Sequence, residues 1–153
     1  MDNREHIYMK KALELARLAF AEGEIPVGAV VVRDGEIIGE GYNQREIKKS
    51  ATAHAEVIAI EEACRRIGDW RLTGCELYVT LEPCPMCAGA IVNSRIKRVV
   101  YGAKDALAGC CGSIIDLNRY PFNHSFAIEG GVMEEDCARL LSCFFEEQRK
   151  KRL

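Results

Sequence analysis

Two short segments contain the side chains best suited to chemistry: residues 52–56, with the sequence TAHAE, and residues 83–87, with the sequence PCPMC. A structural zinc site fills all four tetrahedral positions with protein, whereas a catalytic site has three protein ligands and leaves a position for water. His54, Cys84 and Cys87 supply three zinc ligands. Glu56 is then a carboxylate that the metal does not need and that can move protons. The residues predict a hydrolytic centre with one Zn²⁺ per chain and Glu56 as its catalytic residue.

The position of the two cysteines supports a metal site. Cys84 and Cys87 are three residues apart, so on the first turn of a helix their sulfur atoms share one face. Unpaired backbone N–H groups and the positive end of the helix dipole favour thiolates there, and the thiolate is the form that binds metal. A lone C-x-x-C pair could equally be a redox pair or part of a structural zinc site. The joint occurrence with His54 and Glu56 favours the catalytic interpretation.

His54 and Glu56 impose a condition on the local structure. Two residues apart on a regular helix, their side chains would point roughly 200° away from each other. They can share a pocket only if the pair straddles the start of a helix. Thr52 is a suitable N-cap for a helix that begins near Ala53, so we expect this arrangement.

Composition and charge narrow the class of protein. The 153 residues are predicted to form a single domain, 1–153, and a net charge of −2 does not by itself indicate a nucleic-acid-binding protein. Basic residues gather at 45–49 and at 149–152, where the terminal run is either a solvated helix end or an RNA contact. Residues 1–5 do not resemble a signal peptide, and no run reaches the roughly 18 apolar residues of a membrane helix. We therefore expect a cytoplasmic protein with no membrane association.

The eight cysteines do not indicate a disulfide scaffold, because the sequence has the long periodic segments of an ordinary core and no export signal. Cys110 and Cys111 are adjacent, with Cα atoms about 3.8 Å apart, which is below the usual disulfide range. We expect them to pack in the loop 105–112, since a fourth thiolate ligand would close the water position. The remaining cysteines are predicted to be buried thiols: Cys64, Cys75, Cys137 and Cys143.

Hydrophobic periodicity predicts an alternation of helices and strands. A first helix ends before Gly23, and Asp34-Gly35 forms the tight turn of a hairpin. The strands are expected at 27–33, 36–42, 76–81, 98–101 and 126–129, and the later helices at 53–67, 85–94 and 134–151. The inner stripe of the helix at 53–67 is expected to comprise Val57, Ile60, Cys64 and Ile67. The fold class is therefore α/β, with a mixed five-stranded sheet, helices on both faces and the site at the carboxyl ends of strands.

The resemblance to a known family extends over nearly the whole chain. His-x-Glu together with Pro-Cys-x-x-Cys is the signature of zinc nucleobase deaminases. Segments 52–56, 77–84, 94–96, 98–102 and 123–124 and the closing pair at 144–145 resemble the bacterial tRNA-specific adenosine deaminases of the cytidine/deoxycytidylate deaminase superfamily. The resemblance implies the three-layer cytidine-deaminase-like fold, a homodimer, and conversion of adenosine to inosine at the wobble position of a tRNA anticodon.

The resemblance also implies contacts with the anticodon stem-loop. It assigns the target nucleotide to Asn43 and further RNA contacts to Arg45, Asp105, Phe145 and Arg149. Many relatives follow the Asn-His pair at 123–124 with arginine, whereas this sequence has Ser125, so no RNA contact is assigned there. Each assignment has a structural alternative: Asn43 could end its strand, and Phe145, off the main apolar stripe, could be a core residue rather than a stacking platform.

Two other functions are compatible with the same motifs. A deaminase of free guanine, cytosine or a nucleotide would use identical zinc chemistry, but the basic terminal helix and the whole-length resemblance count against it. A zinc-stabilised RNA-binding module is the non-enzymatic alternative. Glu56 distinguishes the two classes, because a purely structural zinc site gains nothing from a carboxylate beside an open metal position.

Overall fold

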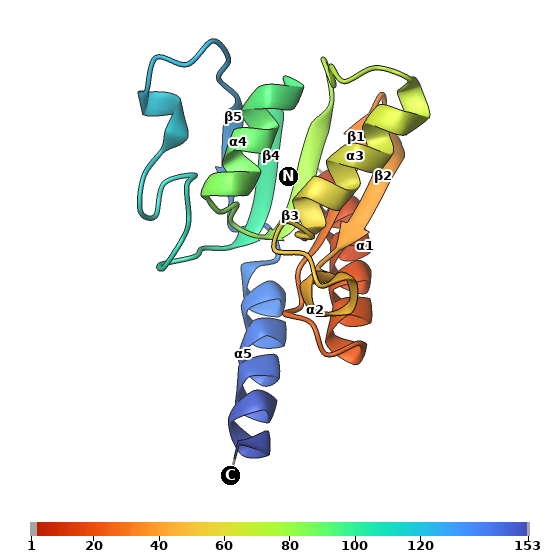
Figure 1. Cartoon of the computed structure of the whole chain (residues 1–153). Coiled ribbons are helices and arrows are strands. Elements are labelled where there is room, and N and C mark those ends of the chain that lie inside the picture. Colours follow the sequence, from red (N-terminus) through yellow and green to blue (C-terminus); the bar gives the residue numbers. More distant parts are fainter. Residues whose placement is uncertain (1–2, 153) are drawn as a thin grey trace.

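The computed structural model describes residues 3–152. Its strands form one mixed five-stranded sheet (Figure 1). In spatial order the strands are β2 (Glu36–Tyr42), β1 (Gly28–Arg33), β3 (Glu76–Leu81), β4 (Arg98–Ala103) and β5 (Ala127–Gly130). β1 is antiparallel to both of its neighbours, whereas β3, β4 and β5 are parallel. The predicted mixed sheet is confirmed.

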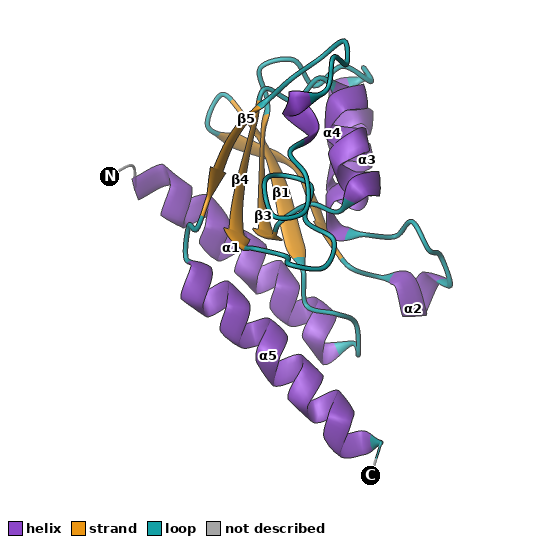
Figure 2. Cartoon of the chain, turned by 90° about the vertical axis from the view of Figure 1, so that its left-hand side faces the viewer, coloured by secondary structure: helices purple, strands orange, loops and turns teal. Residues whose placement is uncertain are grey.

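Helices cover both faces of the sheet and complete three layers (Figure 2). The helices on one face are α1 (Asn3–Ala21) and α5 (Glu134–Lys151), and those on the other are α3 (Ala55–Ile67) and α4 (Pro85–Ser94). Two short elements lie in connections and were not predicted: α2 (Arg45–Lys48) and the 3-10 helix η1 (Leu117–Arg119). Asp34 and Gly35 have φ angles of 50° and 80°, as the predicted two-residue hairpin turn requires.

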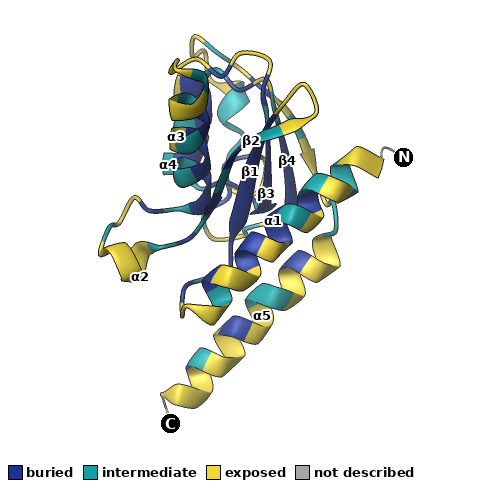
Figure 3. Ribbon diagram, turned by 90° about the vertical axis from the view of Figure 1, so that its right-hand side faces the viewer, coloured by how far each residue is buried: buried dark blue, intermediate teal, exposed yellow. Residues whose placement is uncertain are grey.

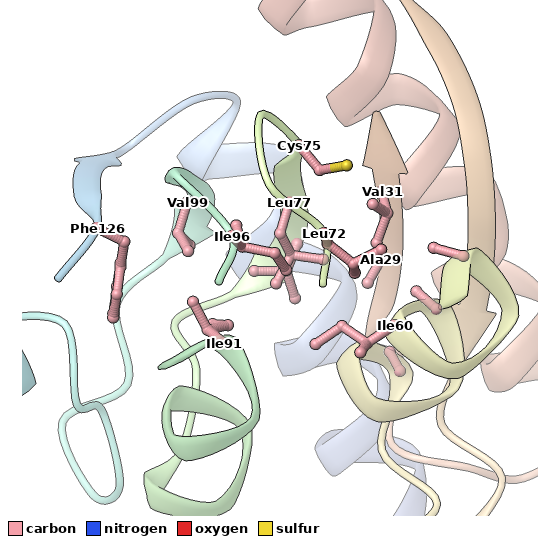
Figure 4. Packing of buried hydrophobic residues seen from close by; sticks show 14 of the residues in the cluster. Ala29, Val31, Ile60, Leu72, Cys75, Leu77, Ile91, Ile96, Val99 and Phe126 are labelled. Carbon is pink, nitrogen blue, oxygen red and sulfur yellow. The ribbon is translucent and has the colours of Figure 1, made fainter. Parts of the chain in front are cut away.

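The central strands are buried on both faces, so successive residues contribute to two different cores. Ala29 and Val31 of β1 pack towards α3 and α4, in the cluster shown in Figure 4, while Val30 and Val32 pack towards α1 and α5. A continuous apolar run, instead of strict alternation, is what a strand covered on both sides needs. Fully burying one such side chain contributes about 1.5–3 kcal/mol.

The backbone of α3 packs unusually close to β2. A Cβ atom at Gly39 or Gly41 would come within 3.0 Å of backbone atoms of α3. The facing side of the helix consists of the small residues Ala55, Ala59 and Ala63, all fully buried. The predicted inner stripe is confirmed for Ile60, which is buried in the core, and for Cys64 and Ile67, which are partly buried and pack against it. Val57 is only partly covered.

Helix α5 covers the sheet with its first turns and then extends beyond it (Figure 3). Cys137 and Phe144 are buried, and the Phe144 ring meets that of Phe20 edge to face at a centroid distance of 5.6 Å. Cys143 lies on the exposed side, so the prediction of a buried thiol is wrong there, and Cys64 is only half-buried. Among the described residues, no helix is long and apolar enough to cross a membrane.

The close packing at Gly41 leads to a testable prediction. Gly41→Ala should lower the free energy of unfolding by about 1–3 kcal/mol, because the added methyl group forces the α3 backbone away from β2. A denaturant titration measures this change. Gly89→Ala in α4 is the matched control, since a Cβ there meets no atom within 4 Å. In a helix interior that change should stabilise by roughly 0.5–1 kcal/mol, and equal effects of the two variants would refute the packing argument.

Candidate active site

The ligand motifs meet at one end of the sheet. β3 and β4 are parallel and both finish there, with Leu81 beside Ala103, and the antiparallel hairpin brings the start of β1 and the end of β2 to the same edge. The connections that follow β2, β3 and β4 therefore converge. This is the expected location of a site in such a sheet.

His54, Cys84 and Cys87 form a compact group of ligand atoms. The Nδ1 atom of His54 is 3.6 Å from the Sγ atom of each cysteine, and all three ligand atoms lie within 4.8 Å of one another. Zn–S bonds of about 2.3 Å and Zn–N bonds of about 2.0–2.1 Å at tetrahedral angles place such atoms roughly 3.6 Å apart. The residues therefore fit zinc. Within residues 3–152 this is the one group of this kind, and it includes neither Cys110 nor Cys111, which are buried beside it.

Each ligand motif lies at the start of a helix. Cys84 is the N-cap of α4, with Pro85 at the first helical position and Cys87 on the first turn. His54 is the N-cap of α3 in an extended conformation, with φ −84° and ψ 151°, and Glu56 follows on the first turn. The pair straddles the helix start, as predicted, so both side chains can reach one cavity.

The helix cap itself differs from the prediction. Thr52 does not cap α3, and the helix begins two residues later than expected, at Ala55. The Oδ1 atom of Asn43 accepts a hydrogen bond of 2.8 Å from the Ala55 N–H group. Asn43 is buried at the end of β2, so the strand end caps a helix that starts 12 residues later in the chain. This bond leaves the amide NH₂ group of Asn43 as a donor.

The protonation states of the three ligand side chains depend on one another. A hydrogen bond from the Cys87 thiol, supported by His54, lowers the pKa of Cys84 to about 4. The same contact, together with burial, raises the pKa of Cys87, because a second thiolate beside the first is unfavourable. Contact with Cys84 also raises the pKa of His54. Both thiolates and a neutral imidazole can coexist once a divalent ion supplies positive charge.

Glu56 has the environment of a proton carrier. Its side chain is only 4% exposed, and burial raises its pKa to about 7. A group that carries its proton near neutral pH is suited to general acid–base steps. The carboxyl group borders the same cavity as His54 and Cys84.

The cavity at this site has a volume of about 200 Å³, smaller than the 300–1,000 Å³ of pockets for drug-sized ligands. Its walls come from the segment before β1, the end of β2, the start of α3, the β3–α4 junction and the loop after β4. The lining residues are Ile25, Val27, Asn43, Arg45, His54, Glu56, Leu81, Glu82, Cys84, Asp105 and Ala108. Such a space suits one ring system.

A second cavity, of about 220 Å³, adjoins the first. The two share Ile25, Asn43 and Arg45 as lining residues. The residues that α5 and the following turn contribute to the second cavity are Phe144, Phe145, Gln148 and Arg152. A continuous concave surface therefore leads from the ligand atoms to the basic end of the chain.

Four of the five predicted RNA-contacting residues border this surface. Asn43, Arg45 and Asp105 border the first cavity, and Phe145, which is 42% exposed, borders the second. Arg149 is exposed but borders neither of them.

Gln148, which sequence reasoning did not single out, borders the second cavity, as does Arg152 of the predicted basic run at 149–152. Gln148 lies three residues after Phe145, so helical periodicity places both on one face of α5, and Arg152 follows directly after the helix. The apolar lining by Ile25 and Val27 has no local signal, because it depends on the way the sheet is assembled.

Two buried glutamates hold the loops around the cavity. Glu24 accepts hydrogen bonds from the N–H groups of Glu46 and Ile47, at 3.1 and 2.8 Å, and so caps α2, which carries Arg45. Glu82 accepts hydrogen bonds from the loop that follows β4. Neither role was predicted.

Comparison with known proteins agrees with this geometry. Residues 2–103 match the family described as the cytidine and deoxycytidylate deaminase zinc-binding region. The tRNA-specific adenosine deaminase of Bacillus subtilis (strain 168) is 50% identical over 150 residues, covering 97% of this chain and 93% of that protein.

Two solved structures extend the comparison. One, from work on A-to-I editing by tRNA:A34 deaminases at the wobble position of transfer RNA, has a TM-score of 0.86 and 40% identity and covers 88% of this chain and 99% of its own. A guanine deaminase from Bacillus subtilis has a TM-score of 0.63 and 45% identity, covering 68% of this chain and 66% of its own. The chain therefore belongs to the zinc-binding cytidine and deoxycytidylate deaminase family, in the group of the tRNA-specific adenosine deaminases.

Proposed function

We propose that this protein is a zinc-dependent hydrolase that converts adenosine to inosine at the wobble position of a tRNA anticodon. One observation carries the proposal: His54, Cys84 and the buried Glu56 border a ring-sized cavity, and Cys87 completes the group of three zinc ligands. A second cavity that shares lining residues with the first leads towards the basic last turn of α5. The proteins to which this chain is similar include ones named tRNA-specific adenosine deaminases.

The chain's own residues account for the chemistry as follows. His54, Cys84 and Cys87 would hold the zinc ion, which when bound lowers the pKa of water to about 7. Glu56 accepts a proton from the water that attacks the amino-bearing ring carbon. It then delivers this proton to the adjacent ring nitrogen and assists departure of the amino group as ammonia. The net reaction replaces the amino group with oxygen.

The cavity requires the target base to leave its stack. This step is least costly for a base in a single-stranded loop, such as an anticodon. The NH₂ group of Asn43 can donate a hydrogen bond to the entering nucleotide, and Asp105 borders the same space. Phe145 offers an exposed ring on which a neighbouring base can stack, while Arg45, Arg149 and Arg152 can bind phosphates.

The resemblance also suggests an assembly and a location. We propose a homodimer, as in the related family, and a cytoplasmic enzyme because its substrate is tRNA. The likeness to a guanine deaminase keeps deamination of a free base as the competing function.

The first prediction here concerns the metal. The purified protein should contain one zinc ion per chain, and Cys87→Ala should lose it and melt at a lower temperature, because metal binding is coupled to folding. Elemental analysis and thermal unfolding measure both effects. Cys110→Ala is the matched control, since its thiol is buried close by but outside the ligand group. X-ray absorption showing a third sulfur ligand would contradict the assignment.

The second prediction separates chemistry from metal binding. Glu56→Gln should keep its zinc and its fold but lose turnover by at least about 10²–10⁴-fold, because an amide cannot shuttle the proton. Single-turnover kinetics on zinc-loaded protein provide the measurement. Near-normal activity in that variant would rule out the proposed role of Glu56.

The third prediction tests the substrate. An anticodon stem-loop should be deaminated at adenosine, with little or no turnover of free adenosine, cytidine or guanine at matched concentration. A cavity for one ring cannot select one RNA, so selection needs contacts along the second cavity and α5. If a free base or nucleoside is the better substrate, the small-molecule deaminase is the correct function.

The basic end of the chain can be tested in the same assay. Removing all residues after Gln148 should weaken stem-loop binding and reduce the logarithmic salt slope by about 0.7 for each phosphate that the protein no longer binds. The zinc content should not change. Arg65→Gln combined with Lys97→Gln, on surfaces that border neither cavity, should leave the slope as it is. A silent truncation would mean that the tail is a solvated helix end and that RNA binds elsewhere.

A further inference from the structure

Glu82 is a buried carboxylate that the proposed chemistry does not use. It lies directly after β3, two residues before Cys84, and is 1% exposed. Its two oxygen atoms accept hydrogen bonds from the N–H groups of Asp105, Cys111 and Ser113, at 3.1, 3.0 and 3.0 Å, and from the Ser113 hydroxyl group. Although burial alone would raise the pKa of Glu82, these bonds hold it below its ordinary value.

The donors all belong to one loop, residues 105–113, which we call the wall loop. A carboxylate has about four lone-pair sites, and four donors occupy them here. Each such bond to a charged acceptor is roughly twice as strong as one between neutral groups. The conformation of the wall loop is therefore organised by its hydrogen bonds to this one carboxylate.

Close packing at Gly109 reinforces the same contact. A Cβ atom on Gly109 would come within 3.0 Å of the Glu82 carboxyl group and of the Asp105 carbonyl oxygen. The loop thus has no space in which to slide across the carboxylate. Further along the loop, the Cys110 N–H group donates a hydrogen bond of 2.9 Å to the Pro83 carbonyl oxygen, which ties the loop to the ligand motif.

The wall loop forms one side of the first cavity. Asp105 and Ala108 border that cavity, as do Asn43 and Arg45 from the connection after β2. The Asp105 side chain accepts hydrogen bonds from the Leu107 and Ala108 N–H groups, so it shapes the same turn. A shift of this loop would change the width of the cavity, whereas the ligand atoms are positioned chiefly by the starts of α3 and α4.

We propose that Glu82 is a positioning residue of the enzyme, whose carboxylate sets the place of the wall loop and thereby the fit of the target base. It acts on the substrate through Asp105 and Ala108, since both of its own oxygen atoms are occupied by loop donors. The inference rests on the proposed function only in naming the base as the group that is positioned.

Glu82→Gln tests the inference, because it keeps the size of the side chain but replaces one acceptor oxygen with an NH₂ group that faces backbone donors. Hydrogen exchange should become faster at the amides of Asp105, Cys111 and Ser113, while zinc content stays at one per chain. The ratio kcat/KM should fall by about 10–100-fold, as expected for a misplacement on the order of 1 Å, and chiefly through a higher KM. Glu76→Gln is the matched control, since Glu76 is a partly buried glutamate at the other end of the same strand.

Gly109→Ala disturbs the same contact from the loop, because the added Cβ atom would collide with the Glu82 carboxyl group, and it should also raise KM. Ser113→Ala removes only the hydroxyl donor and should give a smaller rise, so it remains informative if Glu82→Gln does not fold. Wild-type KM in a variant whose loop amides exchange faster would overturn the positioning role, and unchanged exchange in Glu82→Gln would overturn the anchoring itself.

A wrong substrate assignment would give a different experimental result from a wrong role for Glu82. If the wild-type protein deaminates free guanine and not the stem-loop, the substrate assignment is wrong, and the same KM comparison is made on guanine. The exchange rates of the wall loop need no substrate, so they test the anchor in either case.

Discussion

Three ligand atoms on two helices have to converge within 4.8 Å, and the rest of the molecule is arranged around that constraint. The two cysteines come from one helix start, but the histidine comes from another, so its position depends on how deeply α3 packs against the sheet. Gly39 and Gly41 remove the side chains that would hold the helix away, and the alanines of α3 do the same from the other side. The hydrogen bond from Ala55 to Asn43 then fixes the first turn. The geometry of the metal ligands therefore depends on how closely α3 packs against the sheet.

Buried carboxylates solve a second problem, which is how to hold loops around a cavity. A loop has few backbone partners of its own, so its N–H groups need acceptors. Glu24 and Glu82 provide them on different sides of the cavity, for α2 and for the wall loop. Burying a charge is costly unless hydrogen bonds compensate for it, and here the loops supply those bonds. The loop N–H groups thus stabilise the buried carboxylates, and the carboxylates fix the conformation of the loops.

The parts of the fold that follow from local sequence could be predicted, and those that depend on distant partners could not. β2, β3, α4 and α5 have the predicted bounds, because their periodicity and end signals are local. The start of α3 was placed two residues too early because its cap, Asn43, comes from a strand. α2 was missed because its capping carboxylate lies more than 20 residues away in the sequence. The ligand set and Glu56 could be identified from residue type and spacing alone. A loop at 105–112 was also predicted, but its anchoring could not be, since nothing local indicates that Glu82 is its acceptor.

The glycine contacts of β2 have a consequence for metal affinity. Because His54 is the N-cap of α3, a change that loosens the packing of α3 should displace this ligand and weaken zinc binding, even when every ligand residue is intact. The measured zinc affinity then reports how well α3 packs against β2, including the effect of substitutions far from the metal. A strand variant of this kind should therefore need a higher zinc concentration to reach full occupancy, whereas a ligand variant should fail to bind zinc at any practical concentration.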